Sequence, residues 1–229
     1  MLDAKDGNLP STITNKNVHQ MITVIGNLKG GSGKSTITFN LALWLIREGK
    51  DVLAYDLDPQ CTLSDVVQVR KEENYEPSLT VYNRYQKPQQ KQSIEGVQVL
   101  IDVGTANMNG MKNAVSRADR IIIPVPPSQA DIWSTQRFLY MIASTIRKDQ
   151  PVEVIAFINR ADTHISIRES DEAEEALRTL PGIQVLSARL CQRTTYRRSF
   201  SEGLAVFELD AASKASTEFE EFARCLYPV

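Results

Sequence analysis

The chain of 229 residues carries 26 basic and 28 acidic residues, and its net charge of −2 excludes a strongly basic nucleic-acid binder, so any nucleic-acid contact must come from a local patch. Hydrophobic residues make up 42% and charged residues 24% of the sequence, which is typical of a globular protein long enough for one α/β domain. Three cysteines far apart in the sequence argue against a disulfide framework and favour a reducing cytosol.

The N-terminal segment is polar. Residues 1–20 lack the apolar stretch of a secretory signal, so we expect a flexible arm followed by a single domain over residues 21–229. The longest apolar runs have the length of strands, and no segment is expected to span a membrane.

A glycine-rich segment links a strand expected over residues 21–28 to an amphipathic helix expected over residues 35–47. It reads KGGSGKST; its glycines let backbone N–H groups turn inward, and the helix N-terminus adds partial positive charge. Lys34 is expected to reach the β- and γ-phosphates of a nucleotide, and the Ser35 hydroxyl to hold Mg²⁺. A simple glycine turn with a solvated lysine would not explain why Gly33, Lys34 and Ser35 all fall at the required offsets.

The loop departs from the strict P-loop pattern at its start. Leu28 stands where that pattern has a glycine, and a second lysine, Lys29, follows it.

Further short apolar runs alternate with helical ones along the chain. We expect strands over Val52–Asp56, 97–102, Arg120–Val125, 152–159 and 183–187. We expect helices over residues 131–147, with Asp131 as the N-cap, 167–180 and 213–226. This alternation predicts an α/β fold with a doubly wound, mostly parallel sheet flanked by helices, and a ligand at the carboxyl ends of the strands. Residues 70–96 are polar and are assigned no element.

Three aspartates follow consecutive expected strands. Asp56 and Asp58 end one strand at positions i and i+2, and Asp102 ends the next, two residues before Gly104. A strand that ends in Asp before a glycine turn is typical of a site for Mg²⁺ and a nucleotide. Each Asp alone would more often be a helix cap or a solvated loop end, but three of them beside a phosphate loop favour the nucleotide site.

The motifs KGGSGKST, DLDPQ and LIDVG, in this order, resemble the deviant Walker A, Walker A′ and Walker B motifs of ParA/MinD ATPases. The resemblance covers nearly all of residues 21–226 and implies slow, Mg²⁺-dependent ATP hydrolysis, with ATP and Mg²⁺ as cofactors. The C-terminal region is most similar to the short ParA branch typified by ParF. The residues that carry this similarity are Gln192, Arg193, Tyr196, Ser199, Gly203, Val206, Phe207, Glu208, Ala211 and Ala212.

The resemblance also implies roles for single residues. Lys29 would cross to the nucleotide of a second subunit in an ATP-bound sandwich dimer; the alternative is an ordinary phosphate contact within its own subunit. Catalysis would depend on Lys29, Lys34 and Asp58, with Asp58 positioning the attacking water, although the sequence does not separate the roles of Asp56 and Asp58. The metal residues would be Ser35, Asp56 and Asp102. The nucleotide-binding residues would be Lys29, Gly30, Gly31, Ser32, Gly33, Lys34, Ser35 and Thr36, with Asn159, Arg160 and the turn at 201–207 near the base.

A basic cluster lies near the C-terminus, where ParA relatives carry a DNA surface. Arg189, Arg193 and Arg197 are spaced by four residues and Arg198 is adjacent, so on a helix they would form one stripe that grips duplex DNA without reading its sequence. The alternative is a solvated face paired with the acids of residues 169–175. A terminal membrane helix of the MinD type is disfavoured, because the helix expected over 213–226 is rich in glutamate.

The resemblance therefore implies a cytoplasmic, nucleoid-associated partition ATPase. Its ATP-bound homodimer would bind non-specific DNA and be released by a ParB/ParG-like centromere-binding adaptor, and residues 124–131 would resemble the family's proline-rich interface loop or form a rigid turn. One alternative is a ParA-like ATPase that positions a protein cargo or a conjugation complex. Another is a P-loop kinase, which would need an acceptor pocket and lid that the sequence does not show.

Overall fold

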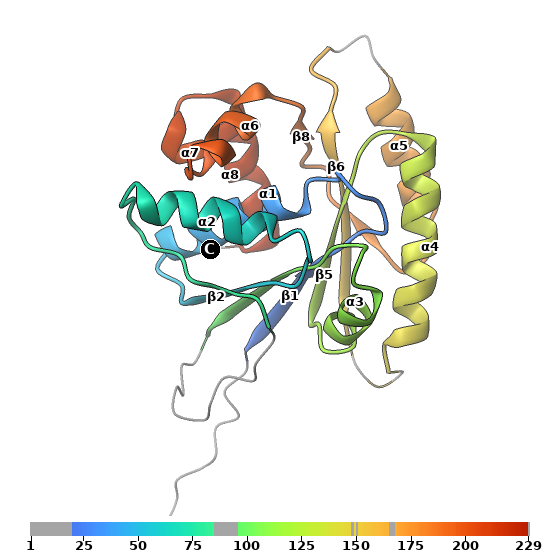
Figure 1. Ribbon diagram of the computed structural model, residues 1–229. Coiled ribbons are helices and arrows are strands. Elements are labelled where there is room, and N and C mark those ends of the chain that lie inside the picture. Colours follow the sequence, from blue (N-terminus) through green and yellow to red (C-terminus); the bar gives the residue numbers. More distant parts are fainter. Residues whose placement is uncertain (1–19, 85–95, 148, 150, 165–167, 229) are drawn as a thin grey trace, which may run out of the picture.

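The computed structural model describes residues 20–84, 96–147, 149, 151–164 and 168–228, and it confirms the expected α/β fold (Figure 1). In these parts of the chain, eight parallel strands form the sheet, in the order β3-β2-β4-β1-β5-β6-β7, with β8 paired to the end of β6. The strands are β1 (Met21–Ile25), β2 (Val52–Asp56), β3 (Val81–Tyr82), β4 (Gln98–Asp102), β5 (Arg120–Val125), β6 (Glu153–Ala161), β7 (Gln184–Val185) and β8 (Leu190–Cys191).

Helices cover both faces of the sheet, and each face has its own apolar core. One core includes Trp44 of α1 and Phe222 of α8, and the other includes Met111 of α3 and Phe138 of α4. The helices are α1 (Lys34–Arg47), α2 (Thr62–Glu72), α3 (Met108–Val115), α4 (Gln129–Thr145), α5 (Glu169–Arg178), α6 (Thr194–Ser201), α7 (Val206–Leu209) and α8 (Lys214–Leu226).

The strand register aligns the polar strand ends. Asp102 at the end of β4 lies beside Ile25 of β1 on one side and beside Asp56 of β2 on the other. Because the strands are parallel, the loops that follow these three residues all leave the same edge of the sheet. The sheet therefore brings together the loop after β1 and two of the three predicted aspartates.

The bounds of β2 and β5 agree with the predicted strands, whereas the start of α4 does not. Ser128 is the N-cap of α4, and its hydroxyl accepts a hydrogen bond from the Asp131 backbone N–H at 3.2 Å. The prediction that Asp131 caps this helix is wrong, because Asp131 lies in the first turn, where an acidic side chain favours the helix dipole.

At the C-terminus, Ser213 caps α8, and Phe219, Phe222 and Leu226 are buried as core residues. The expected arm at 1–20 lies outside the described residues except for Gln20, and so does part of the unassigned 70–96 segment. No helix in the described parts is long and apolar enough to cross a bilayer.

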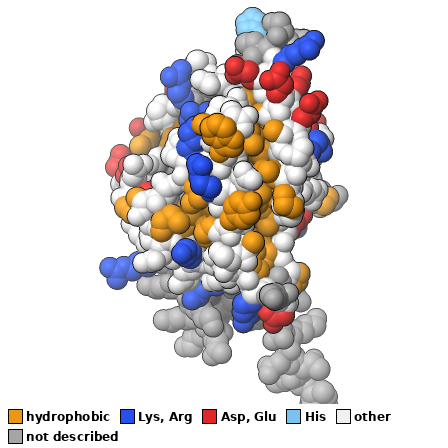
Figure 2. Space-filling model, turned by 90° about the vertical axis from the view of Figure 1, so that its right-hand side faces the viewer, with side chains coloured by type: hydrophobic (Ala, Val, Ile, Leu, Met, Phe, Trp, Pro, Cys, Tyr) orange, Lys and Arg blue, Asp and Glu red, His pale blue; other side chains and the backbone are white. Residues whose placement is uncertain are grey.

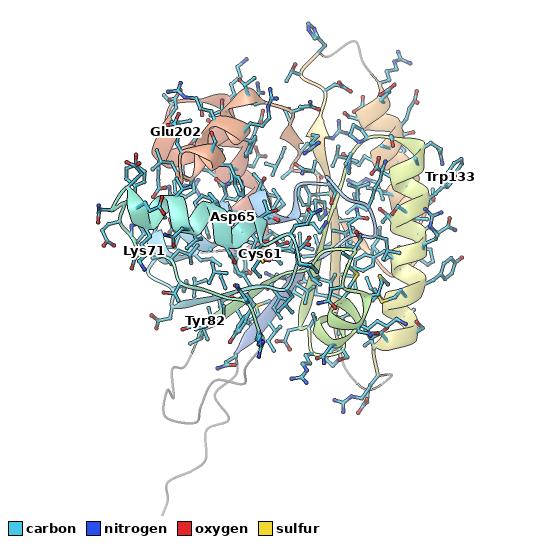
Figure 3. All side chains as sticks on the ribbon, in the orientation of Figure 1. Cys61, Asp65, Lys71, Tyr82, Trp133 and Glu202 are labelled. Atoms are coloured by element: carbon cyan, nitrogen blue, oxygen red, sulfur yellow. The ribbon has the colours of Figure 1, made fainter. Side chains whose placement is uncertain are left out.

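Large hydrophobic side chains are exposed at four described positions, two of them on α4. The exposed residues are Tyr82, Met108, Trp133 and Tyr140. Trp133 points away from the body of the protein, at the opposite side from Tyr82 (Figure 3). The face that carries α4 shows hydrophobic side chains along its middle (Figure 2).

Candidate nucleotide site

The phosphate loop connects β1 to α1 at the carboxyl edge of the sheet. Gly31 and Gly33 have φ values of 74° and 93°, which favour glycine, and no side chain caps the N-terminus of α1. Asn159, at the end of β6, donates a hydrogen bond from Nδ2 to the Ser32 carbonyl at 2.7 Å. A Cβ atom on Gly33 would lie 2.4 Å from that same nitrogen. The Asn159 side chain thus fixes the loop to the end of β6. The backbone N–H groups at the N-terminus of α1 remain available to bind an anion.

Lys34 lies at the floor of the loop and is only 7% exposed. Its Nζ is 3.5 Å from the Lys29 carbonyl oxygen. Burial lowers the pKa of Lys34, and the nearby carboxylates of Asp102 and Asp58 oppose this shift. A lysine that is desolvated and close to carboxylates is suited to bind phosphate oxygens at short range.

Asp102 is fully buried, and neither of its carboxylate oxygens has a hydrogen-bond partner among the described residues. Burial raises its pKa to about 7. Asp56 and Asp58 add to this rise; Ser35 and Lys34 oppose it, although the Ser35 hydroxyl makes no well-formed hydrogen bond here. A buried carboxylate with unmet hydrogen-bonding capacity fits a cation ligand.

The polar groups around Asp102 fit Mg²⁺ in particular. The described residues contain no group of three His, Cys, Asp or Glu side chains that could hold a metal by themselves. Mg²⁺ keeps several waters and is commonly held by one or two carboxylates together with substrate phosphates. Asp102 and Ser35 would therefore supply protein oxygens, directly or through water, and the nucleotide would supply the others.

Asp56 braces the loop that follows β2. Its Oδ1 accepts a hydrogen bond from the Asp58 backbone N–H at 3.2 Å, and its Oδ2 accepts bonds from the backbone N–H and hydroxyl of Ser64, both at 2.9 Å. Sequence reasoning missed Ser64, because nothing in the local spacing links residue 64 to residue 56. The role of Asp56 as a metal residue stays a prediction.

Asp58 lies against the turn that follows β4. Its Oδ1 accepts a hydrogen bond from the Gln60 backbone N–H at 3.0 Å, and a Cβ atom on Gly104 would lie 1.8 Å from its Oδ2. The predicted catalytic aspartate and the predicted Walker B glycine are therefore in direct contact.

We expect Gly104→Ala to impair hydrolysis by displacing the Asp58 carboxylate, with a loss close to that of Asp58→Ala. Nucleotide binding is expected to persist, because the phosphate loop is untouched. Steady-state phosphate release and fluorescent-nucleotide affinity measure the two effects separately. Gly49→Ala is a control for backbone strain without contact to Asp58, since Gly49 has a φ of 74° but open space at its Cβ position, and it lies far along the chain from Gly104. Unchanged turnover in Gly104→Ala would contradict the assigned contact.

Lys29 is paired with a carboxylate of its own subunit. Its Nζ lies 2.7 Å from Asp131 Oδ2; the Lys29 side chain is 44% exposed, and that of Asp131 is 3% exposed. The Ser128 hydroxyl donates to the same Asp131 oxygen at 2.5 Å. The Lys29 backbone N–H donates to Asn27 Oδ1, and Asn27 Nδ2 donates to the Pro124 carbonyl. The start of the loop is thus tied to β5 and α4, and neither Asn27 nor the Asp131 pairing was predicted.

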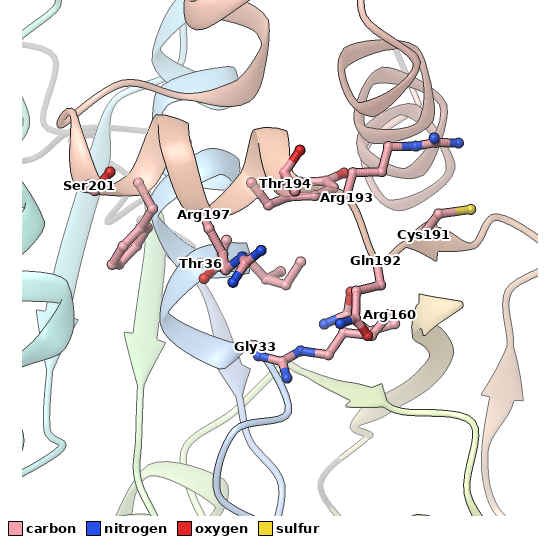
Figure 4. Close-up of a pocket in the computed structure, with 13 residues that line it drawn as sticks. Gly33, Thr36, Arg160, Cys191, Gln192, Arg193, Thr194, Arg197 and Ser201 are labelled. Atoms are coloured by element: carbon pink, nitrogen blue, oxygen red, sulfur yellow. The ribbon is translucent and has the colours of Figure 1, made fainter. Parts of the chain in front are cut away.

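A cavity of about 480 Å³ opens beside the loop, between the end of β6 and α6. Arg160, Gln192 and Arg197 point into it, whereas Arg193 points away (Figure 4). Since the cavity adjoins Gly33, a nucleotide bound on the loop would extend its ribose and base toward these side chains. The expected base contacts of Asn159 and Arg160 stay predictions; Asn159 lies beneath the loop, and Arg160 lines the cavity with a φ of 59°.

The four C-terminal arginines do not form one helical stripe, because α6 begins at Thr194 and Arg189 precedes β8. Arg189 pairs with Asp171 and Glu174, each at 2.6 Å, in agreement with the alternative that these arginines pair with the acidic segment. Arg193 pairs with Glu218 at 2.5 Å and Arg198 with Glu202 at 2.9 Å. The expectation of a single stripe is wrong, and the DNA contact of these arginines stays a prediction.

We expect the free protein to lose stability as pH rises through the window between about 4 and 7, because folded Asp102 binds a proton that the unfolded chain releases near the ordinary aspartate pKa of 3.8. Asp102→Asn removes this loss. Its unfolding temperature should therefore exceed that of the parent protein at pH 8 and approach it at pH 4, by roughly 2–4 °C for each kcal/mol recovered.

Thermal unfolding without nucleotide, from pH 4 to pH 8, measures this difference. Exposed Asp65 in α2 supplies the matched control Asp65→Asn. The same Asp102→Asn variant is expected to lose the Mg²⁺ dependence of nucleotide binding. If the unfolding temperatures of Asp102→Asn and the parent protein changed with pH in parallel, this result would contradict the raised pKa of buried Asp102.

The site consists of a glycine loop with a buried lysine, two aspartates at adjoining strand ends and a cavity beside the loop. These features define a P-loop nucleotide-binding protein. Residues 23–206 match the CobQ/CobB/MinD/ParA nucleotide binding domain, and the chain belongs to that family.

Individual relatives agree with this assignment. The chain is 27% identical over 199 residues to maintenance of carboxysome distribution protein A of Halothiobacillus neapolitanus, covering 85% of this chain and 90% of the relative. It resembles the structure of the MinD cell division protein of Aquifex aeolicus with a TM-score of 0.70 at 20% identity, covering 90% and 96% of the two chains. It also resembles a proposed plasmid partition protein of Borrelia burgdorferi B31 bound to AMPPNP, with a TM-score of 0.69 at 18% identity and coverage of 91% and 98%.

Proposed function

We propose that the protein is a ParA-type ATPase whose dimerisation is controlled by nucleotide. The observation that carries this proposal is the second loop lysine, Lys29, which stands at the protein surface and is held by the single carboxylate of Asp131. A lysine used only for its own nucleotide would have no need of a surface position and an exchangeable partner. Structures of relatives carry AMPPNP or ATP, which supports a triphosphate ligand here.

The residues around the loop divide the chemistry among them. Lys34 and the loop N–H groups would bind the phosphates, and Ser35 and Asp102 would hold Mg²⁺, which would supply positive charge next to the phosphates. Asp58 positions the attacking water. When two loaded subunits meet, each Lys29 leaves Asp131 and neutralises the nucleotide of the other subunit, so the interface is two-fold. Hydrolysis removes that charge interaction and releases the dimer.

The downstream task that we propose is the segregation of DNA. The ATP-bound dimer binds duplex DNA without sequence preference, and a centromere-binding adaptor stimulates hydrolysis and releases it. Among the C-terminal arginines, exposed Arg197 and Arg198 are the best candidates for phosphate contacts. Arg198 pairs with an exposed acid of its own helix, Glu202, whereas Arg189 and Arg193 are less exposed and pair with acids of other elements. A dimer presents two copies of this basic surface, so ATP-dependent dimerisation would raise the affinity for DNA.

A second candidate function is the positioning of a protein cargo. The relative named for carboxysome distribution, which is covered over 90% of its length, favours it. Both functions use the same ATP-dependent dimer on DNA, and they differ in what the adaptor recognises.

The test is binding to duplex DNA of unrelated sequence with and without ATP and Mg²⁺. We expect ATP to raise the affinity about tenfold or more at low salt, and the gain to fall as salt rises. Arg197→Ala should reduce it at saturating ATP, and its nucleotide affinity is measured alongside because Arg197 also lines the cavity beside the loop; Arg178→Ala, on α5, is the control. Equal affinity with and without ATP would overturn the proposed DNA switch.

A further inference from the structure

The carboxylate of Asp131, in the first turn of α4, is buried and has its charge balanced from one side only. Its Oδ2 accepts hydrogen bonds from Lys29 Nζ at 2.7 Å and from the Ser128 hydroxyl at 2.5 Å. Its Oδ1 has no hydrogen-bond partner among the described residues, and the same holds for the buried hydroxyl of Thr135, one helical turn along α4. Among the described side chains, Lys29 is the one cation paired with Asp131. The charge balance at this position therefore depends on that lysine.

The ammonium group of Lys29 occupies an oxygen-lined position that solvent can reach. The Lys29 side chain is 44% exposed, whereas the carboxylate that it contacts is 3% exposed. The Ser128 hydroxyl is bound to the same carboxylate oxygen as the ammonium group. A potassium ion carries the same charge as an ammonium group, is similar to it in size, and binds protein oxygens in place of its hydration shell. The position that the ammonium group holds would therefore fit K⁺ once the lysine has left.

We propose that Asp131 and Ser128 form a binding site for a monovalent cation, K⁺, which is filled when Lys29 leaves. Asp131 Oδ2 and Ser128 Oγ would bind the ion, and water molecules would complete its coordination from the exposed side. The ion would replace the ammonium group as the counter-charge of Asp131, so that the carboxylate is never left buried and uncompensated.

Two other occupants of this position fit less well. A water molecule would satisfy hydrogen-bonding groups but would leave the negative charge of Asp131 unbalanced. Mg²⁺ demands a nearly ideal octahedral shell and gives up its waters reluctantly, and the carboxylate that fits it in this fold is Asp102.

The consequence of the site for dimerisation rests on the proposed function. In the proposed dimer, each Lys29 moves from Asp131 to the nucleotide of the other subunit, and each subunit would then take up one K⁺. At a K⁺ concentration ten times the dissociation constant, each site would be stabilised about tenfold and the dimer, which has two sites, about a hundredfold. The ATP-dependent dimer would therefore depend on K⁺. The site itself does not require the dimer, because removal of the lysine side chain opens it.

Thermal unfolding of Lys29→Ala tests the site without nucleotide. We expect KCl to raise the unfolding temperature of this variant relative to tetramethylammonium chloride at equal ionic strength. The parent protein should respond little, because its own ammonium group holds the position. Lys112→Ala, which removes an exposed lysine of α3, is the matched control, and the double variant Lys29→Ala/Asp131→Asn should lose the response. Absence of K⁺-specific stabilisation in Lys29→Ala, or a response that survives Asp131→Asn, would overturn the site.

Anomalous diffraction locates the ion. Crystals of Lys29→Ala soaked in a thallous salt, in which Tl⁺ stands for K⁺, should show a peak within bonding reach of Asp131 and Ser128. Thallium peaks at other positions alone would refute the assigned ligands.

The dimer of the parent protein provides a test that does not depend on a Lys29 variant. With a non-hydrolysable ATP analogue and Mg²⁺, we expect tighter dimers in KCl than in tetramethylammonium chloride, and Asp131→Asn should remove this difference. Equal dimerisation in the two salts would mean that a proton or a group of the second subunit neutralises Asp131. That result would overturn the proposal and leave the nucleotide switch intact. Absence of any ATP-dependent dimer would refute the switch, whereas K⁺ binding by Lys29→Ala would still support the site.

Discussion

Asp58→Ala is expected to lower the rate of ATP hydrolysis by about 10²–10⁴-fold while leaving ATP binding in place. The Asp58 carboxylate lies against Gly104 in the turn after β4, and no described side chain forms an ion pair with it; in the proposed complex it would face the γ-phosphate. In the proposed mechanism, its loss would remove the group that orients the attacking water and would leave the phosphate loop intact. Single-turnover hydrolysis and nucleotide affinity, measured on the same samples, separate the two effects.

Because hydrolysis ends the dimeric state in the proposed cycle, Asp58→Ala should also accumulate an ATP-bound dimer. Asp65→Ala is the matched control, since Asp65 is an exposed acid on the helix that follows the same loop. Asp56→Ala is not equivalent, because Asp56 binds Ser64 and would disturb the start of α2. Rapid turnover by Asp58→Ala would remove Asp58 from the chemistry and shift attention to Asp56.

The sequence predicted well those elements whose signal is local. The strands β2 and β5 are short, apolar and rich in branched side chains, and their predicted bounds agree with the structure. The start of α4 was misjudged because Ser128 and Asp131 are both good capping residues, and only the observed hydrogen bond distinguishes between them.

In the site, too, the sequence predicted the residues of local motifs but not the contacts between distant segments. Lys34, Ser35 and Asp102 belong to contiguous motifs, and the register of β1, β2 and β4 brings those motifs together. The ion pairs of Arg189 with Asp171 and Glu174 bridge 18 and 15 residues, and no helical spacing encodes them. The prediction of one arginine stripe failed because it assumed one continuous helix, whereas β8 and two residues without regular structure separate Arg189 from α6.

The Lys29–Asp131 pair, 102 residues apart, is the most consequential contact that the sequence did not reveal. The resemblance of the motif predicted that Lys29 acts on a second subunit. The structure adds what this lysine must leave before it can do so: a carboxylate that is 3% exposed and whose other oxygen, Oδ1, has no partner among the described residues. Departure of Lys29 would leave Asp131 charged and buried, which opposes dimerisation.

Lys29→Ala is therefore expected to abolish the ATP-dependent dimer at concentrations where the parent protein dimerises. Truncating one member of a charge pair at an interface typically costs 2–5 kcal/mol, roughly 30-fold or more in affinity. Nucleotide binding should persist, because Lys34 and the loop N–H groups remain. Sedimentation or light scattering with a non-hydrolysable ATP analogue and Mg²⁺ measures the dimer, and Lys34→Ala is the contrasting variant that loses nucleotide itself.

Asp131→Asn sharpens the test, because it keeps the size of the side chain and removes the charge that holds Lys29. We expect this variant to dimerise at lower protein concentration than the parent protein. In the double variant with Lys29→Ala that gain should vanish, since the two changes act on one interaction. A gain that survives without Lys29 would mean that Asp131 acts on the interface by another route, and dimers unaffected by Lys29→Ala would refute the exchange of this lysine between subunits.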